Sequence, residues 1–593
     1  MSAETILSRV HDNARVRPNA IAYHIKKDGQ WVGTTWREYT DEIRQTARAL
    51  IAFGMKPGDT ASILGFNHPE WVIFDLACML VGGVPAGIYT TNAPNEVHYI
   101  IDHAESRIAL VENKSQWEKI NQERERLPNL NRVITMKVSE KIDDPLVLDW
   151  ETFLEQGNDI SDEVVDERMA NLKPDDPATL IYTSGTTGPP KAVILTHHNL
   201  LWTAQQAGDL FGIGEEDSSL SYLPLSHIAE QMFTIHGAIC HSYQVFYAES
   251  IRKMLDNLKE VQPTILFGVP RIWEKIYAGV TSKLKETTGI KAKLMDWAMD
   301  VGKQVITLTN QGKKPNVFLA WQHKLADKLV YSKIKPLIGL SRAYVCITSA
   351  APISHEILDF LAGIDVILHE SYGQSETCGA TTFNYTRHNK VGSVGLPLGN
   401  TKIKIADDGE ILVRSSVVFK GYYKEDEATR KVLHDDWFYS EDLGELDADG
   451  YLTITGRKKD IMITSGGKNI APQNIELALA QLELIAQAIL IGEGQKFVSA
   501  LLTLDEDAMK KFAQKHGISV DESIHDNALI KETIEKEIAD KVNSQFARVE
   551  HVRKFHILPH DFSIEGGELT PTLKIKRQIV TEKYAAEIAA IYS

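Results

Sequence analysis

A loop rich in hydroxyl side chains, glycine and lysine follows a β-prone apolar run near residue 180. Gly185 and Gly188 let the backbone approach an anion closely, and Lys191 adds a positive charge. The hydroxyl donors of the loop are Thr183, Ser184, Thr186 and Thr187. Together these groups suit a polyphosphate. A Walker A loop is excluded because no Ser or Thr follows Lys191, which leaves a plain hairpin loop as the alternative on composition alone.

Residues 182–191 resemble the AMP-binding signature of the adenylate-forming superfamily, which includes acyl-CoA synthetases, firefly luciferase and nonribosomal peptide adenylation domains. Further segments match the same superfamily in the same order, over essentially the whole chain. The resemblance is closest to the long-chain, bubblegum-like branch of fatty acyl-CoA synthetases, judged from residues 223–231 and 571–574. It implies ATP-dependent formation of an acyl-adenylate, followed by transfer of the acyl group to CoA.

The resemblance also implies a nucleotide site. It places Tyr372 against adenine, Asp442 on both ribose hydroxyls and Arg457 on ribose or phosphate. Glu376 and Thr186 would hold Mg²⁺, a hard cation that takes one or two carboxylates besides phosphate oxygens. The predicted nucleotide-binding residues are Thr183, Ser184, Gly185, Thr186, Thr187, Gly188, Lys191, Ser349, Ala350, Ala351, Pro352, Ser371, Tyr372, Gly373, Gln374, Ser375, Asp442 and Arg457.

Acyl transfer is assigned to other residues by the same resemblance. His227 would border the carboxylate pocket, and Trp273 would close the acyl tunnel until ATP binds. Gly466 and Gly467 would line the path of the CoA thiol. Without the resemblance, His227 would be interpreted as a satisfied core histidine and Trp273 as a core aromatic residue.

The C-terminal part of the chain carries a hinge and a lysine. Lys459 matches the hinge position, and Lys574 matches the catalytic lysine, with Lys576 as the fallback. The chain departs from the usual motifs at three places. Ser375 replaces Thr, Ser440-Glu441 replaces Thr-Gly, and Leu573 replaces the Gly before the lysine.

The predicted chemistry joins two anions, because the substrate carboxylate attacks the α-phosphate of ATP. Cations must therefore stabilise the reacting centre, and little acid–base work is needed. The predicted catalytic residues are Lys574, Glu376, Thr186, His227 and Lys191. The alternatives are an acyl-AMP ligase that delivers to a carrier protein, a ligase for another carboxylic acid, and a non-catalytic lipid- or nucleotide-binding protein. The resemblance implies a long-chain acid, and each CH₂ buried in an apolar tunnel contributes about 0.8 kcal/mol, so we expect a preference for acids of about C12 to C18.

Alternation of short apolar runs with amphipathic stretches predicts an α/β fold with layered, mostly parallel sheets. Strands are expected at residues 61–66, 108–111 and 264–267, and a helix at 70–81. The resemblance adds a small β-barrel-like subdomain within an N-terminal domain of residues 1–457. A small mobile α+β domain would occupy residues 458–593, with the hinge at Lys459.

Residues 283–340 form a basic segment with helical periodicity. Val317, Phe318, Trp321, Leu325 and Leu329 recur at intervals of three to four residues and are expected on one helix face. We expect this face to pack on the core and the lysines to be solvated. A helix lying on a membrane surface is the alternative.

The net charge of −16 argues against nucleic acid as a partner. The four cysteines form no CxxC pair, and residues 1–7 show no basic and apolar signal segment, so we expect reduced thiols and a cytoplasmic location, with peripheral membrane contact as an alternative. The expected partners are fatty acid, ATP and CoA, with Mg²⁺ as cofactor. Monomer and homodimer both stay open.

Overall fold

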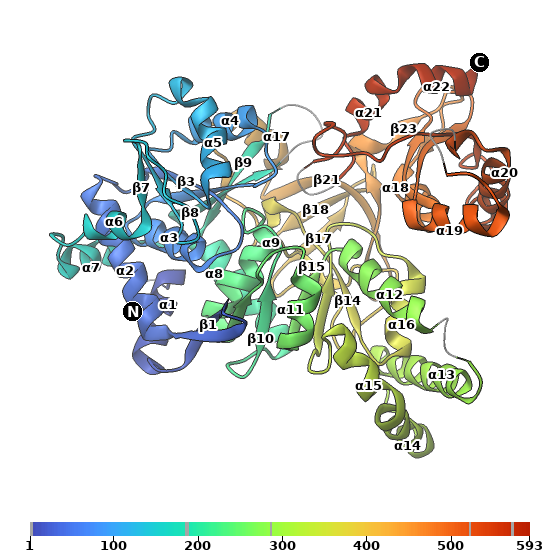
Figure 1. Cartoon of the computed structure of the whole chain (residues 1–593), viewed down its shortest axis with the longest axis horizontal. Helices are drawn as coiled ribbons and strands as arrows, with labels where there is room; N and C mark the ends of the chain where they lie inside the picture. Colours follow the sequence, from blue (N-terminus) through green and yellow to red (C-terminus); the bar gives the residue numbers. More distant parts are fainter. Residues whose placement is uncertain (1–3, 184–188, 285–287, 521–523, 571–573) are drawn as a thin grey trace.

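A computed structural model describes residues 4–183, 189–284, 288–520, 524–570 and 574–593 of the chain. It shows a mixed α/β protein with a large N-terminal part, built from two big sheets and many helices, and a smaller C-terminal part (Figure 1). The predicted fold class is confirmed. The expected strands and helix also appear, each within one or two residues of the expected bounds.

The first large sheet has eight strands and is parallel from β8 to β7. In spatial order its strands are β19 (Gly421–Tyr422), β9 (Lys191–Thr196), β8 (Pro177–Thr183), β4 (Val84–Ile88), β3 (Thr60–Leu64), β5 (Ile108–Val111), β6 (Arg132–Thr135) and β7 (Val147–Asp149). The phosphate-loop residues thus lie between the two antiparallel strands β8 and β9.

The second large sheet has nine strands and is parallel from β14 to β1. In spatial order its strands are β16 (Leu396–Pro397), β15 (Thr382–Phe383), β14 (Leu368–Tyr372), β13 (Val345–Thr348), β12 (Ile265–Gly268), β10 (Ser218–Ser221), β11 (Gln244–Tyr247), β1 (Ile21–Lys27) and β2 (Gln30–Thr35). The carboxyl ends of its parallel strands meet at one edge, where open α/β sheets commonly bind ligands.

The main core lies between the two sheets. Ile63 of β3 and Phe267 of β12 belong to the same buried cluster. Helix α3 fills part of this space and is buried on every side, which explains the apolar sequence of residues 69–80. Alternate residues on the same strands point outward, so Leu64 and Leu266 each join a separate core under an outer helix layer.

Helices cover both sheets and occupy the layer between them (Figure 1). The α-helices of the N-terminal part are α1 (Ile6–Val16), α2 (Trp36–Ala52), α3 (Pro69–Leu80), α4 (Pro94–Ala104), α5 (Lys114–Gln122), α6 (Trp150–Glu155), α7 (Asp162–Ala170), α8 (His197–Phe211), α9 (Ile228–Gln231), α10 (Gly237–His241), α11 (Met254–Val261), α12 (Pro270–Leu284), α13 (Ile290–Asn310), α14 (Val317–Ala326), α15 (Ser332–Ile334), α16 (His355–Gly363) and α17 (Asp426–Val432). A π-helical turn, η2 (Met232–His236), joins α9 to α10.

The small β subdomain is a five-stranded antiparallel sheet. Its strands are β17 (Lys402–Ile405), β18 (Glu410–Arg414), β21 (Trp437–Leu446), β20 (Leu433–His434) and β22 (Leu452–Arg457). The chain leaves this sheet at the end of β22, immediately before Lys459.

The C-terminal part has its own sheet and core. Its strands are the hairpin β23 (Met462–Ile463) and β24 (Asn469–Ile470), and the sheet β25 (Ile485–Ile491), β26 (Val498–Leu504) and β27 (Val552–Ile557). Its α-helices are α18 (Pro472–Ala480), α19 (Glu506–His516), α20 (Ala528–Glu537), α21 (Arg577–Lys583) and α22 (Ala585–Tyr592). This content agrees with the predicted α+β class.

The helical nature of the basic segment is confirmed, but its predicted packing is wrong. Leu319, Ala326 and Val330 form the buried side of α14 and the turn that follows it. Phe318 and Trp321 instead face solvent. The helical period predicts that apolar residues share a face, but it does not determine whether another element covers that face.

No helix in the described ranges is long and apolar enough to cross a membrane. All four cysteines are free thiols, as predicted; Cys78, Cys346 and Cys378 are buried and Cys240 is partly buried.

Candidate active site

Two consecutive strand ends form the floor of a crevice. The turn at residues 349–352 follows β13, and residues 373–376 follow its parallel neighbour β14. The Ser349 hydroxyl donates to the carbonyl of Ser371 at 2.9 Å, which ties the two turns together. Gly373 is required here, because a Cβ would lie 2.4 Å from the carbonyl oxygen of Gly379. Ala350 has a φ of 75°, a strained value for alanine that holds the small-residue turn open.

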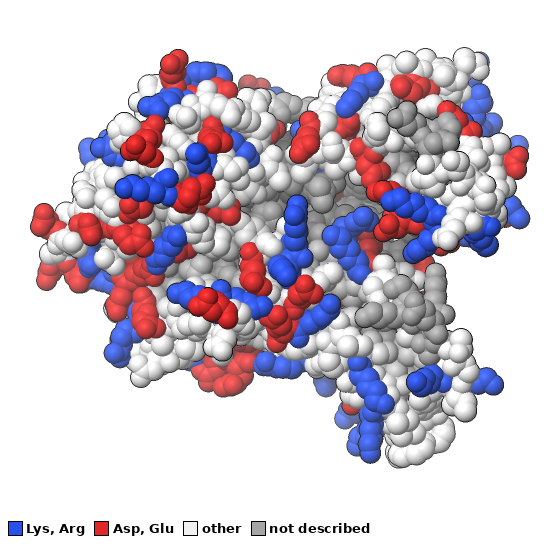
Figure 2. Space-filling view, in the orientation of Figure 1, with Lys and Arg blue, Asp and Glu red and all other residues white. Residues whose placement is uncertain are grey.

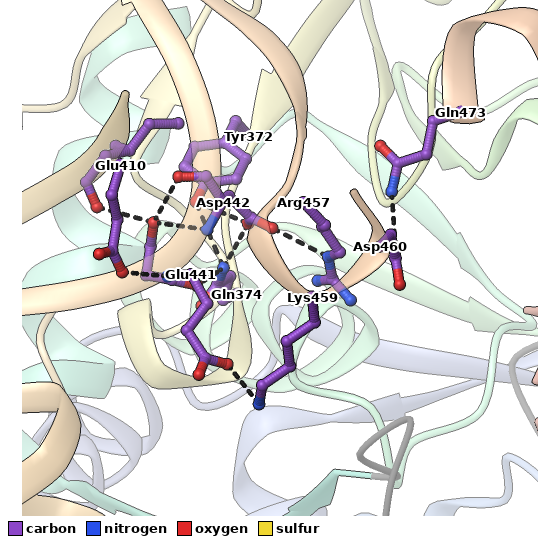
Figure 3. A network of polar contacts seen from close by, with 11 residues as sticks. Tyr372, Gln374, Glu410, Glu441, Asp442, Arg457, Lys459, Asp460 and Gln473 are labelled. Atoms are coloured by element: carbon purple, nitrogen blue, oxygen red, sulfur yellow. Dashed lines mark hydrogen bonds and ion pairs between the residues drawn. The ribbon is translucent and has the colours of Figure 1, made fainter. Parts of the chain in front are cut away.

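A network of polar contacts centres on Asp442 (Figure 3). The Tyr372 hydroxyl donates to Oδ2 of Asp442 at 2.9 Å, and the Gln374 amide donates to the same oxygen. Nε of Arg457 lies 2.9 Å from Oδ1. Asp442 itself is buried, so this ion pair is shielded from solvent on the carboxylate side. Four predicted nucleotide-binding residues from β14, β21 and β22 are thereby brought together.

Glu376 and Lys191 share a neighbour that the sequence did not reveal. The hydroxyl of Tyr422 donates to Oε1 of Glu376 at 2.8 Å. Nζ of Lys191 lies 4.8 Å from the centre of the same phenol ring. Burial raises the pKa of Glu376 above its ordinary value. A carboxylate oxygen is a hard donor, so the chemistry of Glu376 fits Mg²⁺.

Lys574 lies close to these groups although it is distant in sequence. The Thr570 amide donates to the Lys574 carbonyl at 2.8 Å, and the Lys574 amide donates to the Thr570 hydroxyl at 3.0 Å. The side chain is open to solvent, yet burial within the surrounding protein lowers its pKa to about 8. The positive charge of Arg457 lowers this pKa further, while the carboxylates of Asp442 and Glu376 raise it. Lys574 therefore senses the charges of the Asp442 network and of Glu376.

His227 lies within electrostatic range of Lys574. Burial lowers the pKa of its imidazole to about 4, and the charge of Lys574 contributes to this shift. Nδ1 accepts a hydrogen bond from the Ala229 amide at 3.2 Å. A neutral ring with Nδ1 as acceptor carries its proton on Nε2. His227 is therefore a neutral hydrogen-bond donor, suited to orient an anionic substrate.

A buried carboxyl group anchors the turn that carries His227. Glu230 accepts hydrogen bonds from Asn67, Ser221, Thr234 and the Tyr222 amide, at 2.7–3.2 Å. Burial raises its pKa to about 7. The sequence analysis assigned no role to Glu230, and a glutamate followed by glutamine in an apolar segment gives no signal of such a network.

Lys459, the predicted hinge residue, pairs with Glu441, one of the residues that depart from the usual motif. Nζ of Lys459 lies 2.6 Å from Oε2 of Glu441 (Figure 3). Glu441 has a φ of 59°, in the left-handed region that favours glycine. This geometry explains why glycine is usual at the position. It also shows that the backbone keeps the same turn with glutamate.

Three predicted acyl or CoA residues do not join this cluster. Trp273 is fully buried, and its indole donates to the Gly268 carbonyl at 3.0 Å. Gly466 and Gly467 lie in an exposed turn between β23 and β24. The placement of Trp273 supports a core role, and its gating function stays a prediction. Ser184, Gly185, Thr186, Thr187 and Gly188 lie outside the described residues.

A narrow apolar cavity of about 50 Å³ extends from the crevice between α8 and the nine-stranded sheet. Its lining includes Phe233 and Phe267, whose rings stack with centroids 4.8 Å apart. Trp273 packs on the other face of β12, in the cluster that contains Leu266. Sequence reasoning missed this cavity because its wall is assembled from helix and strand residues that are distant in the sequence.

The two ends of the cavity can be distinguished by topology. His227 follows β10 at the carboxyl edge of the sheet, and the chain then runs through η2 and α10 to His241, just before β11. Because β10 and β11 are parallel, His241 lies at the opposite edge. Its Nε2 lies 3.1 Å from the carbonyl of Ala204, and its ring occupies the space that the missing side chain of Gly208 leaves.

Two family models match most of this chain. Residues 10–423 match the family model described as AMP-binding enzyme, and residues 459–593 match the AMP-binding enzyme C-terminal domain. The chain therefore belongs to the AMP-binding enzyme family. This confirms the resemblance inferred from the signature loop.

Two curated relatives are similar over most of their length. Long-chain-fatty-acid–CoA ligase ACSBG2 of Xenopus laevis is 36% identical, over 96% of this chain and 81% of the relative. Long-chain-fatty-acid–CoA ligase FadD15 of Mycobacterium bovis is 35% identical, over 100% and 97%. A solved fatty acyl CoA synthetase of Mycobacterium tuberculosis matches with a TM-score of 0.63 at 20% identity, covering 98% of this chain and 99% of that one. The last match supports the fold.

Proposed function

We propose that this protein is an ATP-dependent long-chain fatty acid–CoA ligase that forms an acyl-adenylate and then an acyl-CoA. The observation that carries the proposal is that Lys574 interacts electrostatically with Glu376, Asp442, Arg457 and His227. An apolar cavity is lined in part by Ala229 and Ser371, which are close in sequence to His227 and Tyr372. Charged groups for a nucleotide and an apolar space for a chain are what the activation of a fatty acid requires.

In the first step, the substrate carboxylate attacks the α-phosphorus of ATP, and pyrophosphate leaves. Lys574 and Lys191 offset the charge of the two approaching anions. Asp442 and Arg457 hold the ribose and phosphate, and Tyr372 lies beside them for the base. Mg²⁺ would be held by Glu376 and Thr186, and when bound it supplies further positive charge to the phosphates.

In the second step, the CoA thiolate attacks the acyl carbon and AMP leaves. The small domain, residues 458–593, would rotate about Lys459 relative to residues 1–457. Rotation would withdraw Lys574 and bring in the turn with Gly466 and Gly467. The orientation described above is the one suited to adenylation, because Lys574 lies beside Glu376 and Asp442.

The acid would be long and apolar. The cavity has a volume of only about 50 Å³, so its lining must separate to admit an acyl chain. Each buried CH₂ contributes about 0.8 kcal/mol, which favours acids of about C12 to C18. The π-helical turn η2, which supplies Met232 and Phe233 to the wall, is a natural place for this adjustment. We place the enzyme in the cytoplasm, as a monomer or a homodimer.

CoA-dependent release of AMP from ATP and palmitate tests the proposal. A ligase releases AMP and forms palmitoyl-CoA, with the rate highest for C12 to C18 acids. Formation of palmitoyl-AMP that does not react with CoA would instead indicate delivery to a carrier protein. Turnover restricted to acetate or benzoate would exclude the long-chain substrate but keep the adenylating chemistry, and no turnover of any acid would indicate a binding protein.

A further inference from the structure

The apolar strip on α14, formed by Val317, Phe318 and Trp321, faces solvent. Val317 is 89% exposed, Phe318 66% and Trp321 58%. The rings of Phe318 and Trp321 are 6.1 Å apart between centroids and nearly parallel, so they form one continuous surface. Contiguous exposed apolar side chains of this size mark an interaction surface.

The helix that carries the strip is firmly built. Asn316 caps its first turn, since its side-chain oxygen accepts from the Leu319 amide at 2.8 Å. Leu319 and Ala326 are buried against the neighbouring helices. The strip therefore lies on the face of α14 opposite its packed side, and α14 lies at the outer end of the helical segment (Figure 1).

Lysines surround the strip and continue its line. Lys324 and Lys328 follow Trp321 at helical spacing and are exposed, as are Lys313 and Lys314 before the helix. Residues 283–340 contain eleven lysines and four acidic residues, in a chain whose net charge is −16. Figure 2 shows basic side chains and almost no acidic ones at this end of the molecule. The local charge is thus opposite in sign to that of the whole protein.

We propose that α14 docks the protein on an anionic phospholipid surface. Val317, Phe318 and Trp321 would enter the boundary between headgroups and acyl chains, while the lysines contact lipid phosphates. A second copy of the chain fits the strip less well, because apposing two such faces would bring their lysines together. Among the described residues no helix can span a bilayer, so the contact lies on the surface.

Flotation of the full chain with vesicles tests this inference, using phosphatidylcholine alone and phosphatidylcholine with 30% phosphatidylglycerol. The wild-type protein should bind the anionic vesicles at least tenfold more tightly, and added salt should weaken this binding. Phe318→Ser/Trp321→Ser should reduce binding to both vesicles about tenfold. Lys324→Glu/Lys328→Glu should remove most of the preference for anionic lipid.

Two matched controls keep the result specific. Lys402→Glu/Lys404→Glu makes the same charge change on β17, where both lysines are exposed, and Val16→Ser removes an exposed apolar residue at the end of α1. Both should bind as the wild type does. Because the assay contains no ATP, acid or CoA, its outcome is independent of the proposed ligase activity.

The proposal is overturned if both α14 variants float like the wild type, or if the wild type binds neither vesicle. Analytical ultracentrifugation without lipid tests whether a second copy of the chain covers the strip instead. A dimer that Phe318→Ser/Trp321→Ser dissociates would show that the strip joins two copies of the chain, and this too would refute docking on lipid.

Discussion

Lys459 and Glu441 form an ion pair, with Nζ of the lysine 2.6 Å from Oε2 of the glutamate. Glu441 precedes Asp442, the centre of the polar network, and its amide donates to Glu410 at 2.8 Å. The pair therefore links the point at which the C-terminal part would rotate to the strand that would hold the ribose. If the C-terminal part rotates about Lys459 as proposed, the pair would stabilise the orientation seen here over any orientation in which Lys459 has moved.

Glu441→Gln should shift the balance between the two half-reactions. The pair is about half exposed, and such pairs contribute about 0.2–1 kcal/mol, or up to about fivefold in an equilibrium. Thioester formation from added acyl-AMP should therefore accelerate by up to about fivefold while adenylation changes little. Glu445→Gln, an exposed residue on the same strand, is the control and should change neither step. Equal effects of the two variants would contradict a role for the pair.

Lys574→Ala should abolish acyl-AMP formation and spare thioester formation from added acyl-AMP. The ammonium group is needed only while the carboxylate and phosphate anions meet. Single-turnover measurements of each half-reaction check this, and circular dichroism checks the fold. Lys576→Ala should leave adenylation within about threefold of wild type. If Lys576 were the catalytic lysine, Lys576→Ala would abolish adenylation and Lys574→Ala would not.

The pH dependence of adenylation should report the lowered pKa of Lys574. Below about pH 8 the free enzyme carries the charged ammonium, and above it the charge is lost. The kcat/KM for adenylation should therefore fall as pH rises through about 8, while thioester formation from acyl-AMP does not. Lys574→Arg keeps its charge throughout this range, so its profile should lack the descending limb. The same limb in both proteins would point to another group.

Glu376→Gln should raise the Mg²⁺ concentration needed for half-maximal adenylation by about tenfold or more, because one carboxylate charge on a hard cation is lost. Titration of the initial rate with Mg²⁺ at saturating ATP measures the effect. Glu370→Gln is the control, as Glu370 lies on β14, six residues before Glu376, and accepts from the Gly392 amide. A lower maximal rate with unchanged Mg²⁺ dependence would argue against ligation by Glu376.

Gly208→Ala should shorten the longest acid that the enzyme accepts. The added Cβ would lie 2.0 Å from Nε2 of His241, so the imidazole must move at the far end of the apolar cavity. Activity with C16 and C18 acids should fall about tenfold relative to C8, since each CH₂ excluded from the cavity forfeits about 0.8 kcal/mol. Gly214→Ala has open space around it and serves as control. A uniform loss across all chain lengths would contradict this role.

The sequence was sufficient to predict the α/β class and the main strands, because apolar runs and helical periodicity are local properties. That Tyr372, Asp442 and Lys574 share one site was predicted from the family resemblance, because no local sequence pattern relates residues so far apart. The partnership of Tyr422 with Glu376 was not predictable, as Tyr422 stands in an ordinary Gly-Tyr-Tyr segment. The exposed face of α14 was mispredicted because periodicity does not reveal what covers a helix.

The phenol of Tyr422 connects the two large sheets at the predicted nucleotide site. Tyr422 belongs to β19 of the eight-stranded sheet, whereas Glu376 follows β14 of the nine-stranded sheet. Its hydrogen bond thus fastens the two halves of the crevice, and its ring receives the cation of Lys191. One uncharged side chain thus contacts both the carboxylate of Glu376 and the ammonium group of Lys191. ATP and its metal ion would then exchange contacts with groups that Tyr422 already holds in position.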